Sequence, residues 1–245
     1  MKIPEIHPID KISFTLPEAI SLSNQLELFG FNGAKNDILR FDLVFDSGRW
    51  TEPAPLIAES VAKLFKSGTS TQSSFELNEA IENYGSTIRA TAGYNTFTVS
   101  VYCMNRFLAP TLQLLKTCLT DIIFPQKEID LMQQNALAKL KVSKEKNDFL
   151  ADVAFKKNIF GAQHPYGYET SEIAIQQISQ ELLLQFYKKD LQLNNATLFI
   201  AGKYGKTELD LIEQYLGTMP VSTSLPTKAA PVFTDDFSQQ KISIQ

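Results

Sequence analysis

A strand-turn-strand pattern near the middle of the chain constrains the fold more than any other feature. From Thr96 to Met104 every second side chain is apolar, as in a strand with one buried face. The turn residues Gly93-Tyr94-Asn95 separate this segment from residues 86–92, which also suit a strand. The pattern therefore predicts a β-hairpin that covers one side of a core.

A second hairpin is expected nearer the N-terminus. Segments 26–31 and 38–46 both suit strands, and Asn32-Gly33 and Asn36-Asp37 supply turn residues between them. The run ATLFIAG at 196–202 predicts one further, buried strand.

Helices are expected between and after these strands. Pro53 and Pro55 open one that continues to about Lys66. Ser73 and Glu76 have the spacing of a capping box and start another, which ends at Gly85. Strand pairs followed by helix pairs, without a βαβ rhythm, predict an α+β fold, a mainly antiparallel sheet with helices packed on it. Further helices are expected at 108–123, about 126–158, two short stretches ending near 189, and 208–216.

Composition excludes several functional classes. The chain has 245 residues, of which 44% are hydrophobic, and a formal net charge of −4. It is therefore not a disordered chain, and it has no apolar run long enough to span a membrane. No basic patch with interleaved aromatics indicates nucleic acid, because the KLKVSKEK run at 139–146 fits a solvated helix face. The first ten residues carry no apolar stretch of a secretory signal, so we expect a cytoplasmic location.

Few residues are available for catalysis or metal binding. The two histidines, His7 and His164, lie too far apart in sequence for a helical zinc motif. We expect His164 to pack within its loop, with a binding role as the alternative. Cys103 and Cys118 are expected to be buried, unreactive thiols, since no basic partner lies near either in sequence.

One helical pair becomes informative in its surroundings. Glu59 and Lys63 are four residues apart with the acid first, the favourable order for an ion pair on a helix. They lie within GRWTEPAPLIAESVAKLFKSGT at 48–69. Three more stretches accompany this one, namely FELNEAIENYGSTIRATAGYNTFTVSVYCM (75–104), FLAPTLQLLKTCLTDIIFPQKEIDLM (107–132), and HPYG (164–167) with NATLFIAG (195–202).

In order and spacing these stretches resemble the insulinase/pitrilysin/mitochondrial-processing-peptidase family of zinc peptidases, over about residues 20–217. Members of that family carry H-x-x-E-H on a helix, followed by a Gly-Thr pair. Counting back from Gly68-Thr69 places Glu59, Ala62 and Lys63 where the family has its first histidine, its glutamate and its second histidine. The family's third ligand is a glutamate on a later helix, and here no Asp or Glu occurs between Asp130 and Glu145.

The resemblance therefore implies a zinc peptidase fold without catalytic or metal residues. In this family one domain is duplicated, and copies without the motif shape a peptide-enclosing chamber. We expect a non-catalytic accessory subunit or half-molecule that holds no cofactor, contacts peptide, and pairs with a motif-bearing homologous subunit or with a missing second half; zinc is expected only in that partner. Two alternatives stay open at this point. The chain can belong to an active zinc metalloendopeptidase whose site lies outside it, or it can be a peptide-binding or structural module without a proteolytic partner.

Domain organisation follows from the same comparison. Residues 1–217 are expected to form one peptidase-like domain, half of a duplicated architecture. Residues 218–234 are rich in proline, serine and threonine and predict a linker. In residues 235–245, Ile242 and Ile244 alternate with polar residues, which predicts the start of a strand. The resemblance implies that this strand opens a second homologous domain in a longer chain.

Overall fold

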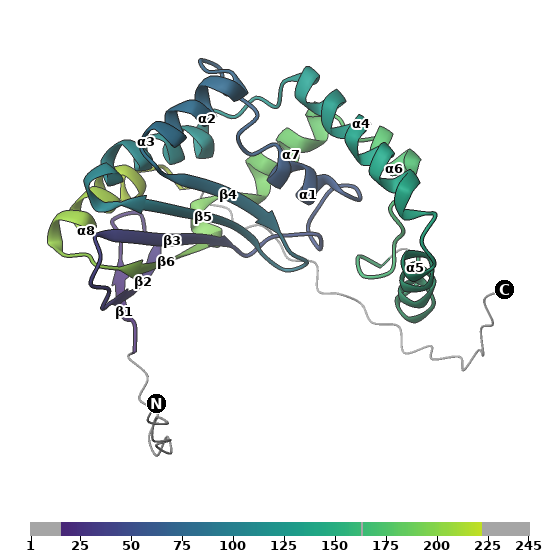
Figure 1. Cartoon of the computed structure of the whole chain (residues 1–245). Helices are drawn as coiled ribbons and strands as arrows, with labels where there is room; N and C mark the ends of the chain where they lie inside the picture. Colours follow the sequence, from purple (N-terminus) through teal and green to yellow (C-terminus); the bar gives the residue numbers. More distant parts are fainter. Residues whose placement is uncertain (1–15, 163, 222–245) are drawn as a thin grey trace, which may run out of the picture.

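The computed structural model of the protein describes residues 16–162 and 164–221 (Figure 1). The described part has an α+β architecture built on one six-stranded sheet. The strands are β1 (Glu18–Ser21), β2 (Glu27–Asn32), β3 (Ile38–Phe45), β4 (Thr87–Ala92), β5 (Phe97–Met104) and β6 (Ala196–Gly202). The helices are α1 (Ile57–Lys63), α2 (Ser74–Asn83), α3 (Leu108–Thr120), α4 (Gln126–Ser143), α5 (Asn147–Phe160), α6 (Glu172–Gln176), α7 (Gln180–Asp190) and α8 (Lys206–Ile212), the last continuing as a π-helical turn at Glu213–Gly217.

The hairpin that the sequence predicts most clearly is present. β4 and β5 pair antiparallel, with Ala92 opposite Phe97 next to the turn. Every second side chain of β5 is buried, as the alternation requires. This part of the prediction is confirmed.

The predicted hairpin of β2 and β3 is wrong. The strand order is β1-β2-β6-β3-β5-β4, so β6 lies between them. β6 pairs antiparallel with β3 and parallel with β2, and β1 covers the outer side of β2. The turn residues at 32–37 therefore lead the chain past one intervening strand. The sheet is mixed but mainly antiparallel, since β2 and β6 form its parallel pair.

Helices pack on one face of the sheet (Figure 1). The buried residues of β3, β5 and β6 form one core cluster with those of α1, α3 and α7, including Phe65 and Phe186. α2 begins with the predicted capping box, because the Ser73 side chain accepts from the Glu76 amide while the Glu76 carboxylate accepts from the Ser73 amide. Gly85, just beyond the helix, has a positive φ of 59°, which suits glycine.

Three predicted helices have other bounds in the structure. α1 begins only at Ile57, because Leu56 has a left-handed φ of 73°, and it ends at Lys63. α3 stops at Thr120 because Ile122 forms a β-bridge with Thr69. The long helix expected over 126–158 is two helices, since Lys146 is extended and separates α4 from α5.

α5 is set apart from the sheet, beyond the end of α4 (Figure 1). None of its own described residues is fully buried, although Phe149 packs partly against the core. The helices before and after it in the chain, α4 and α6, contact each other.

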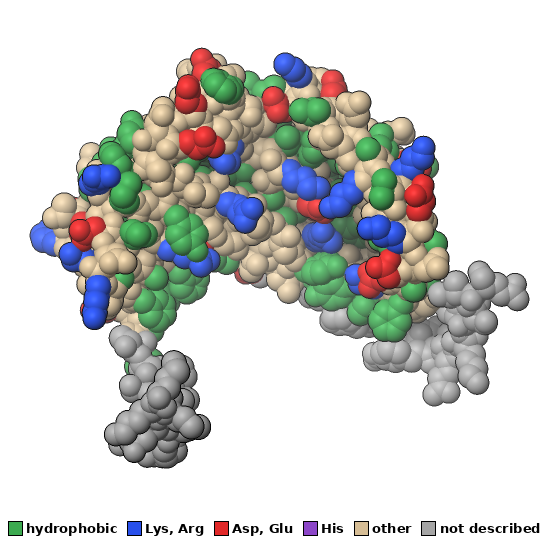
Figure 2. All heavy atoms as spheres, in the orientation of Figure 1, with side chains coloured by type: hydrophobic (Ala, Val, Ile, Leu, Met, Phe, Trp, Pro, Cys, Tyr) green, Lys and Arg blue, Asp and Glu red, His purple; other side chains and the backbone are tan. Residues whose placement is uncertain are grey.

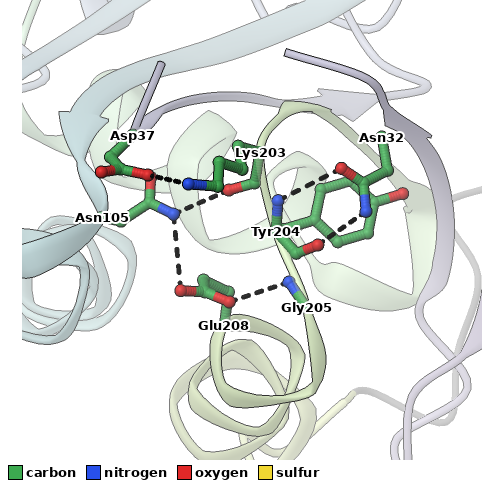
Figure 3. Close-up of polar contacts among 7 residues, drawn as sticks. All are labelled: Asn32, Asp37, Asn105, Lys203, Tyr204, Gly205 and Glu208. Carbon is green, nitrogen blue, oxygen red and sulfur yellow. Dashed lines mark hydrogen bonds and ion pairs between the residues drawn. The ribbon is translucent and has the colours of Figure 1, made fainter. Parts of the chain in front are cut away.

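Polar contacts fix the end of β6 against the start of α8 (Figure 3). The Asn105 side-chain amide donates to the Lys203 carbonyl at 2.7 Å and lies 3.4 Å from a Glu208 oxygen. The other Glu208 oxygen accepts from the Gly205 amide at 2.8 Å, and Lys203 pairs with Asp37 at 2.7 Å. This network is structural and binds adjacent strands to one helix.

Some expectations fall partly or wholly beyond these residues. His7, most of the expected linker and the expected second-domain strand at 235–245 lie outside the described residues. Within the described ranges no helix combines the length and the apolar content needed to cross a bilayer.

Candidate functional site

The candidate site is centred on α1, the helix on which the resemblance places the peptidase motif. Glu59 and Lys63 form the expected ion pair, with Oε1 and Nζ 2.8 Å apart. Both side chains are partly exposed, at 36% and 52%. Ala62 lies on the same helix, partly buried against the core.

A second cation reaches Glu59 from the segment after β3. The Arg49 guanidinium donates to Glu59 Oε2 at 2.9 Å, so each carboxylate oxygen has its own cation. The Arg49 amide donates to Gly93 O at 3.1 Å, which holds this segment on the β4–β5 turn. The guanidinium also stacks over the Tyr94 ring, 5.1 Å from its centroid. The same hairpin that defines the fold thus positions Arg49.

A third cation faces the pair from α4. Lys139 lines the same cavity as Glu59 and Lys63, and its charge acts on Glu59. Partial burial disfavours ionisation of Glu59, but the hydrogen bond from Lys63 and the charges of Lys63, Arg49 and Lys139 outweigh it. They hold the pKa of the Glu59 carboxyl below its ordinary value. Figure 2 shows Lys and Arg side chains gathered around acidic ones on this face of the molecule.

The cavity between α1 and α4 is small and mainly apolar. Its volume is about 170 Å³, and the cations stand among its lining residues. Apolar side chains of α4, α5 and the α6 region make up most of its wall: Met132, Ala136, Leu140, Phe149, Ile175 and Ile178.

The start of α1 is fixed by a partly buried carboxylate. Glu52 accepts from the Tyr168 hydroxyl at 2.6 Å and from the Ala58 amide at 2.9 Å. Burial raises the pKa of Glu52 above its ordinary value, against the lowering effect of these hydrogen bonds. This contact connects α1 to the loop at 164–169 and keeps its orientation.

The loop that contains His164 is an aromatic cluster. The His164 ring lies 4.8 Å from Trp50 and 5.3 Å from Phe160, and its Nδ1 accepts from the Tyr166 amide at 3.0 Å. These contacts place the ring within the loop's packing, as expected from the sequence. Both cysteines are buried, and burial raises the pKa of each thiol to about 12.

The donors at this site do not suit zinc. Zinc needs three or four neutral imidazole, thiolate or carboxylate donors that converge. Here one carboxylate is available, and both of its oxygens are occupied by cations. A metal ion beside Glu59 would also meet the charges of Arg49, Lys63 and Lys139. No group of three His, Cys, Asp or Glu residues with metal-binding geometry occurs in the part of the chain that the structure describes.

The α+β fold, with α1 at its candidate site, is that of a peptidase-like domain. A family model described as Insulinase (Peptidase family M16) matches residues 34–164, which is more than half of the chain. The chain therefore belongs to the insulinase family of peptidases. No curated protein sequence matches it.

Solved structures share the fold. An inactive M16 peptidase domain from Pseudomonas fluorescens matches with a TM-score of 0.78 and 17% identity over 88% of this chain and 54% of that one. The periplasmic protease PqqL from Escherichia coli matches with a TM-score of 0.76 and 17% identity over 92% of this chain and 26% of that one. The first half of PqqL matches with a TM-score of 0.69 and 17% identity over 88% of this chain and 49% of that one. At these identities the likeness shows the fold alone, and the chain spans about half the length of the first structure.

Two of the three cations were not found by sequence reasoning. Arg49 lies ten residues before Glu59 and outside the helix, in a segment where Gly48 packs closely against the Gly93 and Tyr94 carbonyls. Lys139 belongs to the basic run that the sequence assigns to a solvated face. The absence of acids over 131–144 was the available signal that α4 brings no carboxylate to this site.

Proposed function

We propose that this chain is a non-catalytic peptidase-like protein that shapes a peptide-binding chamber, as an accessory subunit or half-molecule of a metallopeptidase. The observation that carries the proposal is the state of Glu59. Its carboxylate is held by Arg49 and Lys63, and Lys139 faces it from α4. The cations neutralise this carboxylate, and the group offers neither a metal-bound water nor a general base.

The proposal includes a partner. A peptidase chamber needs a second wall, and the chain spans only about half of the inactive-domain structure that it resembles. We propose that the partner is a motif-bearing homologous subunit or the second half of a longer chain. The expected cytoplasmic location stays a prediction, which fractionation of the native host would test.

The experiment compares turnover with and without this chain. A motif-bearing homologue from the same genome is purified alone and then mixed with this protein, and cleavage of an unstructured peptide is followed. The mixture should turn over faster, because a closed chamber orients the substrate. This protein alone should show no turnover. Equal rates and equal specificity for the homologue alone and for the mixture would contradict the proposal.

A variant separates chamber shaping from hidden catalysis. Lys63→Ala removes one cation from α1 without creating a metal ligand. If this protein contributed a catalytic group through α1, the variant would abolish the gain in turnover. A chamber wall predicts a change in KM with the value of kcat largely kept.

A further inference from the structure

We propose that the groove along α1 binds an acidic segment of polypeptide through Lys63, Lys66, Arg89 and Lys139. The inference rests on the proposed function, in which this face meets peptide, and it adds the chemical class of the ligand. Its basis is the charge and shape of the described surface around α1.

Three adjoining cavities share Lys63. The first, between α1 and α4, has a volume of about 170 Å³ and contains Lys139. The second, of about 350 Å³, continues along the same two helices with Lys139 and Glu128. The third, of about 590 Å³, passes from α1 to strand β4 and contains Lys66 and Arg89. Because all three have Lys63 in their walls, they adjoin one another at this residue of α1, and we call them together the α1 groove.

Cations exceed acids in the α1 groove. Five cationic side chains line the three cavities, against the carboxylates of Glu59 and Glu128. The chain as a whole carries a net charge of −4, so this local excess opposes the general composition. The third cavity is the most basic part, because no carboxylate lines it. Its cationic residues are Arg40, Lys63, Lys66 and Arg89.

Two of these charges are already balanced within the protein. Arg40 pairs with Asp42 at 2.9 Å, and Lys63 pairs with Glu59. Lys66, Arg89 and Lys139 form no ion pair with any residue in the described ranges. A groove with uncompensated cations attracts anionic ligands and disfavours cationic ones.

The walls favour polypeptide over nucleic acid. Leu56, Met132 and Leu140 give the first cavity an apolar lining that suits a hydrophobic side chain next to an acidic one. A phosphate backbone would pair with the cations but would leave this apolar lining unused. An acidic peptide with interspersed apolar residues satisfies both features.

The test measures peptide binding by fluorescence anisotropy with the full chain. The probe is a short rhodamine-labelled peptide of Glu, Ala and Leu, amidated at its C-terminus. A second peptide replaces every Glu with Gln and keeps a free C-terminal carboxylate, and a third replaces Glu with Lys. The acidic peptide should bind at least about tenfold more tightly than the Lys peptide, and raising salt from roughly 50 to 300 mM should weaken it. Tighter binding of the Gln peptide would assign the site to the terminal carboxylate in place of acidic side chains and would overturn the proposal as stated.

Paired variants locate the binding site. Lys66→Glu with Arg89→Glu should weaken binding of the acidic peptide about tenfold or more. Lys35→Glu with Lys157→Glu makes the same change in net charge on exposed residues outside the groove, and should change binding of the acidic peptide little. Thermal unfolding of both double variants checks that each is folded. If the groove double variant does not fold, the single Lys139→Gln variant should still weaken binding of the acidic peptide.

Three outcomes would overturn the inference. Equal effects of the two pairs would show general attraction by net charge. Equal affinity for the acidic and Lys peptides would leave peptide binding, and so the proposed function, intact while removing its acidic preference. Tighter binding of a labelled single-stranded oligonucleotide than of the acidic peptide would assign the groove to nucleic acid.

Discussion

Replacing Glu59 with glutamine tests how the charges on α1 are balanced. The substitution removes the negative partner of both Arg49 and Lys63, whose side chains are 25% and 52% exposed. Ion pairs at such exposed positions contribute about 0.2–1 kcal/mol each, and glutamine keeps one oxygen as an acceptor. We expect a loss of about 1 kcal/mol in the free energy of unfolding, or about 2–4 °C in Tm for a domain of this size.

The loss should depend on pH in one direction. Because the folded-state pKa of Glu59 lies below its ordinary value of 4.5, its ionised form stabilises the fold above that value. The stabilisation is lost as the pH falls through the folded pKa. Urea unfolding curves of the two proteins should therefore differ at pH 7 and converge in acid.

The same substitution should strengthen binding of the acidic peptide while it lowers stability. Glu59→Gln raises the positive charge of the α1 groove, so the acidic peptide should bind about two- to tenfold more tightly although the protein is less stable. Glu79→Gln is the matched control, since Glu79 is exposed on α2 and forms no ion pair with described residues. A loss above about 3 kcal/mol would mean that the pair behaves as a buried network. Weaker binding of the acidic peptide would refute the charge argument.

Three further predictions concern the frame that holds the site. Gly30→Ala should cost about 1–3 kcal/mol, because its Cβ would overlap the Tyr204 hydroxyl, and the cost should fall in a Tyr204→Phe background when both are measured by urea unfolding. Cys103 and Cys118, with pKa values of about 12, should not react with a disulfide reagent at pH 8 until the protein is unfolded; rapid reaction of either thiol in the native protein would contradict its burial. Ser73→Ala should cost about 1 kcal/mol by removing the α2 capping box, and Ser73→Asp should restore most of it.

Local sequence patterns predicted the strands themselves better than they predicted which strands pair in the sheet. Alternation identified β2 and β3 as strands, but it carries no information about which strand lies beside them. The short connection with turn residues favoured a hairpin, whereas the structure inserts β6, from more than 150 residues later, between the two. The parallel pairing of β2 with β6 is a property of the whole sheet and has no local signal.

The break between α4 and α5 also lacks a local breaker. Residues 144–146 contain neither glycine nor proline, so periodicity alone continues the helix through them. The extended Lys146 redirects the chain and brings Phe149 back to the cavity that Lys139 lines. The shape of the candidate site therefore depends on a turn that the sequence did not indicate. The assignment of Glu59, Ala62 and Lys63 to the motif positions came from the resemblance and stays a prediction.

Rebuilding a metal site is the strictest test of the correspondence between α1 and the family motif. Glu59→His, Ala62→Glu and Lys63→His together provide two imidazoles one turn apart and a candidate base. We expect zinc to bind this variant weakly, because Lys139 still presents a positive charge to the same cavity. Adding Lys139→Glu replaces that charge with a carboxylate donor and should tighten zinc binding on the order of tenfold or more, as measured by competition with a chromogenic chelator. Lys141→Glu is the matched control, since it makes the same charge change on α4 at an exposed residue that does not line the cavity. If Lys141→Glu tightened zinc binding as much as Lys139→Glu, the gain would be a general effect of charge, and the placement of Lys139 opposite the motif positions would be wrong. A gain confined to Lys139→Glu would mean that this domain keeps the peptidase geometry and has replaced only the ligands.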